Sequence, residues 1–229
     1  MAATTLQGGA GNEIVVPEDV PVAIAQPSEA TGGAAIVEVL GTASELQVAV
    51  GGEAPVEFIG ATVKNSSVTA VAPAGETAQI SFETKTVTKT KITSSGEGAV
   101  EVEVSDGKFK KSEIDFSSST ADDSIGFGEI TVTKASITLG DGGKDTVTFS
   151  DGIKLKGNTK IRTGTGKDTI EVPSNPKGKG TISISNFEKK DKLMVDGEKM
   201  KGKKIYNGKK EIPDYIGIQF TDGEVVIGT

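Results

Sequence analysis

The chain has 229 residues, a net charge of −7 at pH 7, and only 4% aromatic residues with no Trp. It contains neither Cys nor His, which excludes disulfides, thiol chemistry, Ser-His and Cys-His nucleophile pairs, and the commonest ligand of zinc and copper. Scattered carboxylates could in principle serve a glycosidase, but no spacing singles out a pair, so we expect no enzymatic activity.

Residues 1–53 form an acidic segment without Lys or Arg. Met1 to Gly11 has no basic region followed by an apolar one, so we expect no secretory signal peptide. No apolar run approaches the 18 or more residues that a membrane span needs, so we expect no membrane insertion. The apolar stretches Ile14–Val16, Ile36–Leu40 and Leu46–Val50 resemble strands of one or two degenerate repeat units.

A repeat occupies the centre of the chain. Three segments begin Asp123-Ser-Ile-Gly-Phe127, Asp145-Thr-Val-Thr-Phe149 and Asp168-Thr-Ile-Glu-Val172, with spacings of 22 and 23 residues. A fixed period of this length is typical of a solenoid or an array.

The same register extends in both directions, with apolar residues at offsets 2, 4, 9 and 14 from each start. The upstream units begin at Ala54, Ala78 and Val100, and the downstream unit begins at Asp191. The apolar residues of these four units are Val56, Phe58, Val63 and Val68; Ile80, Phe82, Val87 and Ile92; Val102, Val104, Phe109 and Ile114; and Leu193, Val195, Met200 and Ile205. We therefore assign residues 54–200 to the repeats.

Within each unit the apolar residues alternate with polar ones, which is the period of a strand with one buried face. Three short strands per unit, separated by turn residues, predict one coil of a parallel β-helix that buries its inner face by stacking on its neighbours. We therefore predict an all-β solenoid with coils of about 22–23 residues. An antiparallel sandwich, whose strands also recur every 8 to 12 residues, is the alternative.

Two units depart from the register. In the unit from Asp145 the later apolar residues, Leu155 and Ile161, come late. In the unit from Asp168, Pro173, Pro176 and Gly178 stand where a middle strand is expected, which predicts a loop bulging from a turn.

The end of the chain, residues 201–229, is predicted to be a β-hairpin cap. Asn207-Gly208 at the centre of residues 203–212 is a hairpin signal, and a second hairpin is expected from Tyr215–Phe220, Asp222-Gly223 and Glu224–Ile227. A solenoid needs such a cap, because an open last coil would expose the edge of its sheets.

Charge is distributed unevenly. Residues 1–63 hold eight carboxylates and no base, whereas residues 64–229 carry a net charge of +1. Residues 189–210 hold nine Lys against three acids. This polarity predicts head-to-tail self-association or docking on another structural protein, through Lys199, Lys201, Lys203, Lys204, Lys209 and Lys210. Solubilisation of the solenoid edge by lysine is the alternative.

Nucleic-acid binding is not expected, because the net charge is −7 and the basic segment has a single aromatic, Tyr206.

Several of these segments resemble the Gly-Gly-x-Gly-x-Asp-x-apolar repeat of hemolysin-type (RTX) proteins. They are Gly8-Gly9-Ala10-Gly11-Asn12-Glu13, Gly140 to Val147, and Thr163 to Ile170. Ile184 to Phe187, Asp191 to Gly197 and Ile218 to Gly223 resemble the module that often ends those chains. The resemblance implies export by a type I system and calcium bound near Asp145 and Asp168, with Asp123 and Asp191 in the same column.

The sequence also departs from this family. The family's half-turns have nine residues, and here Asp141 and Thr163 occupy places where Gly is expected. Lys144, Lys167 and Lys190 each precede a column aspartate, so a ladder of Lys-Asp ion pairs is predicted to neutralise the column and to lessen the need for a cation.

Two functions follow from these patterns. The first is a non-enzymatic structural protein, a building block or decoration of a virion exterior, a tail or fibre, or a cell-surface layer, with no required cofactor. The second is a type I-exported, calcium-binding RTX-like protein of the cell surface or extracellular matrix. A glycan-binding role could accompany either, although Trp and Tyr are scarce.

Overall fold

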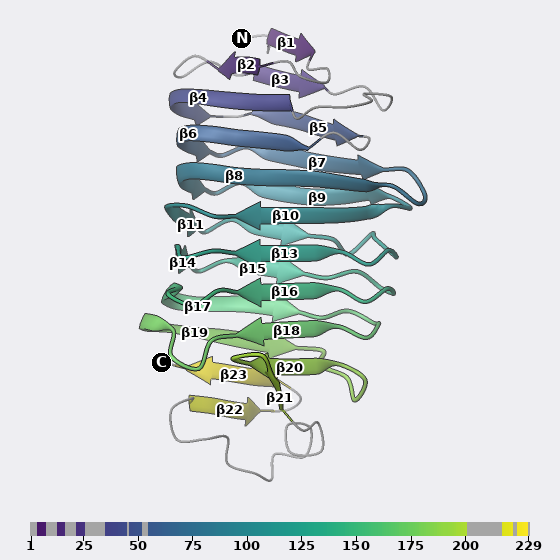
Figure 1. Cartoon of the computed structure of the whole chain (residues 1–229), viewed down its shortest axis with the longest axis vertical. Coiled ribbons are helices and arrows are strands. Elements are labelled where there is room, and N and C mark those ends of the chain that lie inside the picture. The colour runs from purple at the N-terminus through teal and green to yellow at the C-terminus, as the bar shows by residue number, and fades with distance from the viewer. Residues whose placement is uncertain are drawn as a thin grey trace.

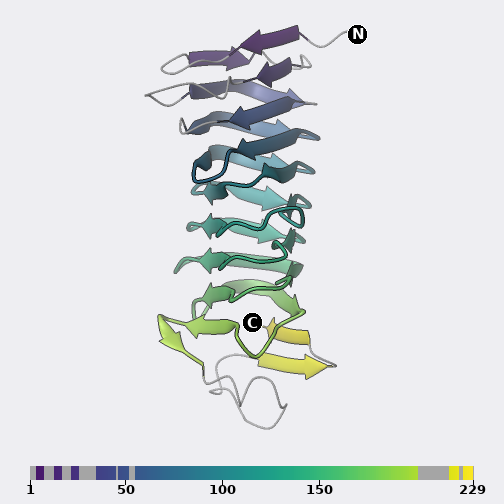
Figure 2. The ribbon, with the colours of Figure 1, turned by 90° about the vertical axis from the view of Figure 1, so that its right-hand side faces the viewer.

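The computed structural model describes residues 4–7, 13–16, 22–25, 35–44, 46–51, 55–200, 217–221 and 224–228, with side-chain detail for 42–44, 46 and 55–200. Its elements are all strands. They stack as successive coils into an elongated β-solenoid (Figures 1 and 2). The strands between residues 55 and 190 pair in parallel, so the predicted parallel solenoid is confirmed and the antiparallel sandwich is excluded.

Each coil contributes to three columns of hydrogen-bonded strands. The first column contains β2 (Glu13–Val16), the first parts of β4 (Ala35–Ser44), β6 (Val56–Lys64) and β8 (Thr77–Thr88), then β10 (Ala99–Val104), β13 (Ser124–Phe127), β16 (Thr146–Phe149), β18 (Thr169–Val172) and β20 (Lys192–Val195). The second contains the last parts of β4, β6 and β8, then β11 (Lys108–Lys110), β14 (Thr131–Thr133) and the first parts of β17 (Lys154–Arg162) and β19 (Lys177–Ser185).

The third column closes each coil. It contains β1 (Thr4–Gln7), β3 (Val22–Ala25), β5 (Gln47–Gly51), β7 (Ser67–Ala72), β9 (Lys91–Gly96), β12 (Glu113–Asp115), β15 (Ser136–Thr138) and the last parts of β17 and β19. The three apolar stretches predicted in residues 1–53 fall on β2, β4 and β5, so they are strands that continue the same columns.

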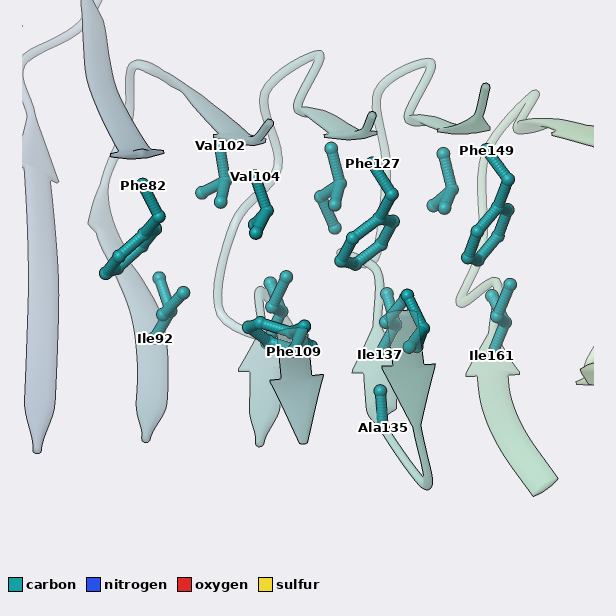
Figure 3. Close-up of a cluster of buried hydrophobic side chains, with 14 of the residues drawn as sticks. Phe82, Ile92, Val102, Val104, Phe109, Phe127, Ala135, Ile137, Phe149 and Ile161 are labelled. Carbon is teal, nitrogen blue, oxygen red and sulfur yellow. The ribbon is translucent and has the colours of Figure 1, made fainter. Parts of the chain in front are cut away.

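The core consists of rows of apolar side chains that run from coil to coil. Residues at matching offsets pair across coils, as in the row Phe82, Val104, Phe127 and Phe149 of the first column (Figure 3). The rings of Phe127 and Phe149 stack with centroids 5.1 Å apart, and those of Phe109 and Phe127 meet edge to face at 5.4 Å. A coil cannot bury its inner face alone, so this stacking provides most of the stabilisation.

The two irregular units keep the columns in different ways. Leu155 pairs with Val132 and Ile161 with Ile137, so both late residues reach their rows. One additional residue lies in the turn before Leu155, where Gly152 has a φ of 85°, and another lies between Leu155 and Ile161, where Gly157 has a φ of 68°. The loop expected around Pro173 to Gly178 is shorter than predicted: the strand resumes at Lys177, and Gly178 pairs with Leu155.

The unit from Asp191 departs from the predicted coil within residues 191–200. Leu193 and Val195 are buried in β20, but the chain then reverses and β21 (Glu198–Lys199) pairs antiparallel with β20. The reversal occurs at Asp196-Gly197, with φ values of 49° and 74°, which suit a two-residue hairpin turn. Met200 therefore donates its N–H to Leu193 O instead of starting a second-column strand, and Ile205 lies outside the described residues.

The predicted second hairpin of the cap is confirmed. β22 (Gly217–Thr221) and β23 (Glu224–Gly228) pair antiparallel, and β23 also pairs antiparallel with the last part of β19, so it covers the third column. The hairpin predicted at Asn207-Gly208 lies outside the described residues.

Candidate functional site

Four buried aspartates form a column at the start of the first-column strands. Asp123, Asp145, Asp168 and Asp191 directly precede β13, β16, β18 and β20, whose first residues are in register. These residues are 1%, 0%, 0% and 4% exposed, in that order. The predicted common column is therefore present, and we call these four residues the aspartate column.

Each carboxylate binds the main chain of the preceding coil. Oδ1 of Asp123 accepts the N–H of Val100 at 2.7 Å, and Oδ1 of Asp145 accepts the N–H of Asp123 at 2.9 Å. The N–H of Asp145 donates to Oδ1 of Asp168, and the N–H of Asp168 donates to Oδ1 of Asp191, both at 3.2 Å. The aspartates thus link successive coils at a corner where backbone donors would otherwise be buried without partners.

The Oδ2 atoms of the four aspartates differ in whether they accept a hydrogen bond. Oδ2 of Asp145 accepts the N–H of Gly140 at 3.0 Å, and Oδ2 of Asp191 accepts the N–H of Glu188 at 2.6 Å. Oδ2 of Asp123 and Oδ2 of Asp168 are buried without a hydrogen-bond partner. The partnered and unpartnered oxygens therefore alternate along the column.

The predicted ladder of Lys-Asp ion pairs is absent from the described residues. Lys144, Lys167 and Lys190 are exposed, and none of them forms an ion pair with a column aspartate. Lys190 instead pairs with Glu188, with Nζ and Oε2 3.2 Å apart. The reason is local geometry, because each column aspartate points inward and the lysine beside it points to solvent.

Burial raises the pKa values of the aspartates in the column. Desolvation raises the pKa of Asp145 to about 6 and that of Asp168 to about 7, and the charges of neighbouring aspartates add to both shifts. Burial also raises the pKa of Asp123 and of Asp191. The bonds from backbone N–H groups oppose these shifts but do not cancel them, so part of the column carries protons near neutral pH.

The glycines before Asp145 and Asp168 fit a close stack of turns. Gly143 and Gly164 have φ values of 73° and 74°, in the left-handed region. A Cβ on Gly164 would lie 2.1 Å from Gly140 O, and a Cβ on Gly143 would lie 2.2 Å from Ala121 O. The glycine-rich segments that resemble RTX repeats therefore have a structural role, which is to let one turn lie directly on another.

Thr163, which stands at a place where the resemblance expects glycine, is also accounted for. Its side chain is fully buried, and its hydroxyl donates to Asn186 O in the next coil at 2.8 Å.

The aspartate column offers few free oxygens to a cation. Six of its eight carboxylate oxygens accept backbone N–H groups, and the remaining two, on Asp123 and Asp168, lie two coils apart. At about 4.8 Å per coil, they are too distant to share one ion. Among the described residues no group of three or more carboxylates converges as a metal site. The arrangement does not supply the six to eight oxygens that calcium requires, and calcium binding stays a prediction.

Of the lysines predicted to mediate assembly, Lys199 lies at the end of β21 and is exposed. Lys201, Lys203, Lys204, Lys209 and Lys210 lie outside the described residues.

A second basic surface was not anticipated from the sequence. The outward positions of the second column carry exposed lysines in four coils, and we call this set the lysine face: Lys64, Lys108, Lys110, Lys154, Lys156, Lys177 and Lys179. The available signal was the Lys-x-Lys pattern around Phe109, Leu155 and Gly178, which recurs at the same position of three units.

Comparison of the chain with protein-family models, with curated proteins and with solved structures finds no match. The part of the chain that the structure describes contains no helix that could span a membrane.

Proposed function

We propose that this chain is a non-enzymatic structural protein, a rigid β-solenoid that serves as a building block or decoration of a surface assembly. A virion exterior, a tail or fibre, and a cell-surface layer are the settings that suit it. The observation that carries the proposal is the interior, in which apolar rows and the aspartate column link coil to coil through the protein's own groups.

The chemistry of the chain supports a structural role over catalysis. Without His or Cys it lacks the usual general base and thiol nucleophile. The most strongly shifted carboxyl groups, Asp145 and Asp168, are fully buried and bonded to backbone N–H groups, so they have no surface on which to meet a substrate.

A second function is favoured by a specific observation. The glycine-rich turns before Asp145 and Asp168, followed by stacked carboxylates, are compatible with a type I-exported, calcium-binding RTX-like protein of the cell surface. The two functions differ in their dependence on calcium, because a metal that completes a fold supplies part of its folding free energy.

Localisation tests the structural proposal. Antibodies against the purified chain, applied with gold labels to intact cells or particles of the source organism, are expected to mark a regular exterior surface in electron micrographs. Labelling that requires lysis and then follows no structure would contradict the proposal. Particles from a strain with the gene deleted provide the control for antibody specificity.

A further inference from the structure

The lysine face is a basic strip that is interrupted by two coils with Thr at the same positions. Lys108 is in register with Thr131, Lys154 and Lys177, and Lys110 is in register with Thr133, Lys156 and Lys179. Between Thr62 and Lys179 the outward positions of this column hold Thr and Lys and no acid. Within residues 55–200 none of the seven lysines forms an ion pair.

The first column presents the opposite charge over its earlier coils. Its outward positions there carry four glutamates and no base, and we call this set the glutamate face: Glu57, Glu83, Glu101 and Glu103. Glu101 accepts a hydrogen bond from Gln79 at 3.0 Å and has no cationic partner in the described coils. Burial raises the pKa of Glu103, and the like charge of Glu101 adds to the shift.

The two faces are opposite in sign and share one geometry. Both are built on stacked parallel strands, so the charges on either face are separated along the axis by multiples of about 4.8 Å. Both are also two charges wide in places, as in Glu101 and Glu103 on β10 and Lys108 and Lys110 on β11. Two copies placed side by side can therefore bring several of these opposite charges close to one another.

We propose that the glutamate face of one copy docks laterally on the lysine face of a second copy of this chain. The glutamates occupy the coils of β6 to β10, whereas six of the seven lysines lie on β11, β17 and β19, so the copies are displaced along their axes. Because the two faces differ, the contact is heterologous and extends into a row instead of closing as a pair.

This inference rests on the proposed structural function and names the partner of that assembly. It differs from head-to-tail association, because it uses the sides of the solenoid and not its ends. Nucleic acid is the weaker candidate for the lysine face, because it leaves the glutamate face without a role.

Sedimentation velocity of the full chain over a range of concentrations tests the proposal. At about 0.01 M salt, where charges act over roughly 30 Å, we expect reversible association that disappears at about 1 M salt, where they act over roughly 3 Å. Changing Lys108, Lys110, Lys154 and Lys156 to Thr should weaken the association by about tenfold or more. Thr suits these positions, because Thr131 and Thr133 occupy them in an intervening coil.

The matched control removes charge from another side of the same coils. Lys160→Thr with Arg162→Thr alters the outward positions of the third column on β17 and should leave association unchanged. Circular dichroism of every variant confirms that it has folded.

Charge exchange gives the sharpest result. A variant with the four lysines changed to Glu and a variant with Glu101→Lys and Glu103→Lys should each stay monomeric alone, yet associate when mixed. If each variant alone associates as strongly as the wild type, lateral docking is overturned, while a structural role stays in place. A wild type that stays monomeric at low salt but binds heparin through the same lysines would also overturn it, and would identify a polyanion as the occupant.

Discussion

Oδ1 of Asp145 accepts the backbone N–H of Asp123 at 2.9 Å, although 22 residues separate the two in the chain. This bond joins the starts of two successive coils, and the same relationship recurs between Asp168 and Asp145 and between Asp191 and Asp168. The repeated aspartate is thus a structural element, because it satisfies a buried donor once in every coil.

Replacing Asp145 by Ala should be strongly destabilising. The change leaves the N–H groups of Asp123 and Gly140 without their acceptor, and each such buried donor costs about 1–3 kcal/mol. Urea denaturation should show a loss of about 2–6 kcal/mol in the free energy of unfolding. The control is Asp141→Ala, an exposed site where about 0.5 kcal/mol or less is expected. A loss of unfolding free energy in Asp145→Ala as small as that in Asp141→Ala would mean that this aspartate does not stabilise the fold.

Stability should fall as pH rises through neutrality. The folded-state pKa values of Asp145 and Asp168, about 6 and about 7, lie above their ordinary value of 3.8, so the folded chain holds more protons than the unfolded chain between these limits. The stabilisation is complete below about pH 4 and is lost as pH rises to about 7. Denaturation midpoints measured from pH 4 to 8 check this.

Asp168→Asn isolates the cause of that pH dependence. The amide keeps an oxygen for the N–H of Asp145 and places its nitrogen where Oδ2 has no partner, so the variant should fold. Its stability should change less between pH 5 and 8 than that of the wild type. The control Asp151→Asn alters an exposed carboxylate and should keep the wild-type profile. An unchanged profile in Asp168→Asn would refute a titrating column.

Comparing Gly164→Ala with Gly75→Ala should separate the cost of a clash between stacked turns from the cost of backbone strain. The added Cβ would lie 2.1 Å from Gly140 O, at a φ of 74° that Ala rarely adopts. Gly75 has a similar φ of 82° but nothing within 4 Å of such a Cβ. Gly75→Ala should therefore cost only the conformational strain of about 1–3 kcal/mol, and Gly164→Ala clearly more. Similar thermal midpoints for the two variants would argue against close stacking of the turns.

Phe127→Ala should show that the core is continuous along the axis. Its ring contacts Phe149 on one side and Phe109 on the other, so truncation opens a cavity across neighbouring coils. The expected loss is about 3–5 kcal/mol in urea denaturation. Val71→Ala, at an exposed position 44% accessible to solvent, is the control and should stay within about 0.5 kcal/mol. A comparably small loss in Phe127→Ala would contradict this packing.

The fold could be predicted because the apolar register is strict. Val56, Ile80 and Val102 recur at one offset and pair with one another in the first column, since a coil that slipped by one residue would turn its apolar face outward. The extension to Met200 failed because Asp196-Gly197 makes a hairpin turn, and local turn chemistry overrode the period there. Asp-Gly is itself a hairpin signal that can be read in the sequence.

The site was predictable only in part. The common column of Asp123, Asp145, Asp168 and Asp191 follows from the period alone. Their hydrogen bonds do not, because these depend on the height of each carboxylate relative to the backbone of the preceding coil. The Lys-Asp pairing was wrong because residues adjacent in an extended chain point to opposite sides, so Lys144 faces solvent where Asp145 faces the core.

Far-ultraviolet circular dichroism of the full chain in excess chelator, repeated after adding millimolar calcium, tests the central claim most directly. A structural solenoid held by its apolar rows and its aspartate column should give the same β spectrum and the same unfolding midpoint in both conditions. A chain that is unfolded in chelator and becomes β only with calcium would contradict this account, and would make the aspartate column a metal site.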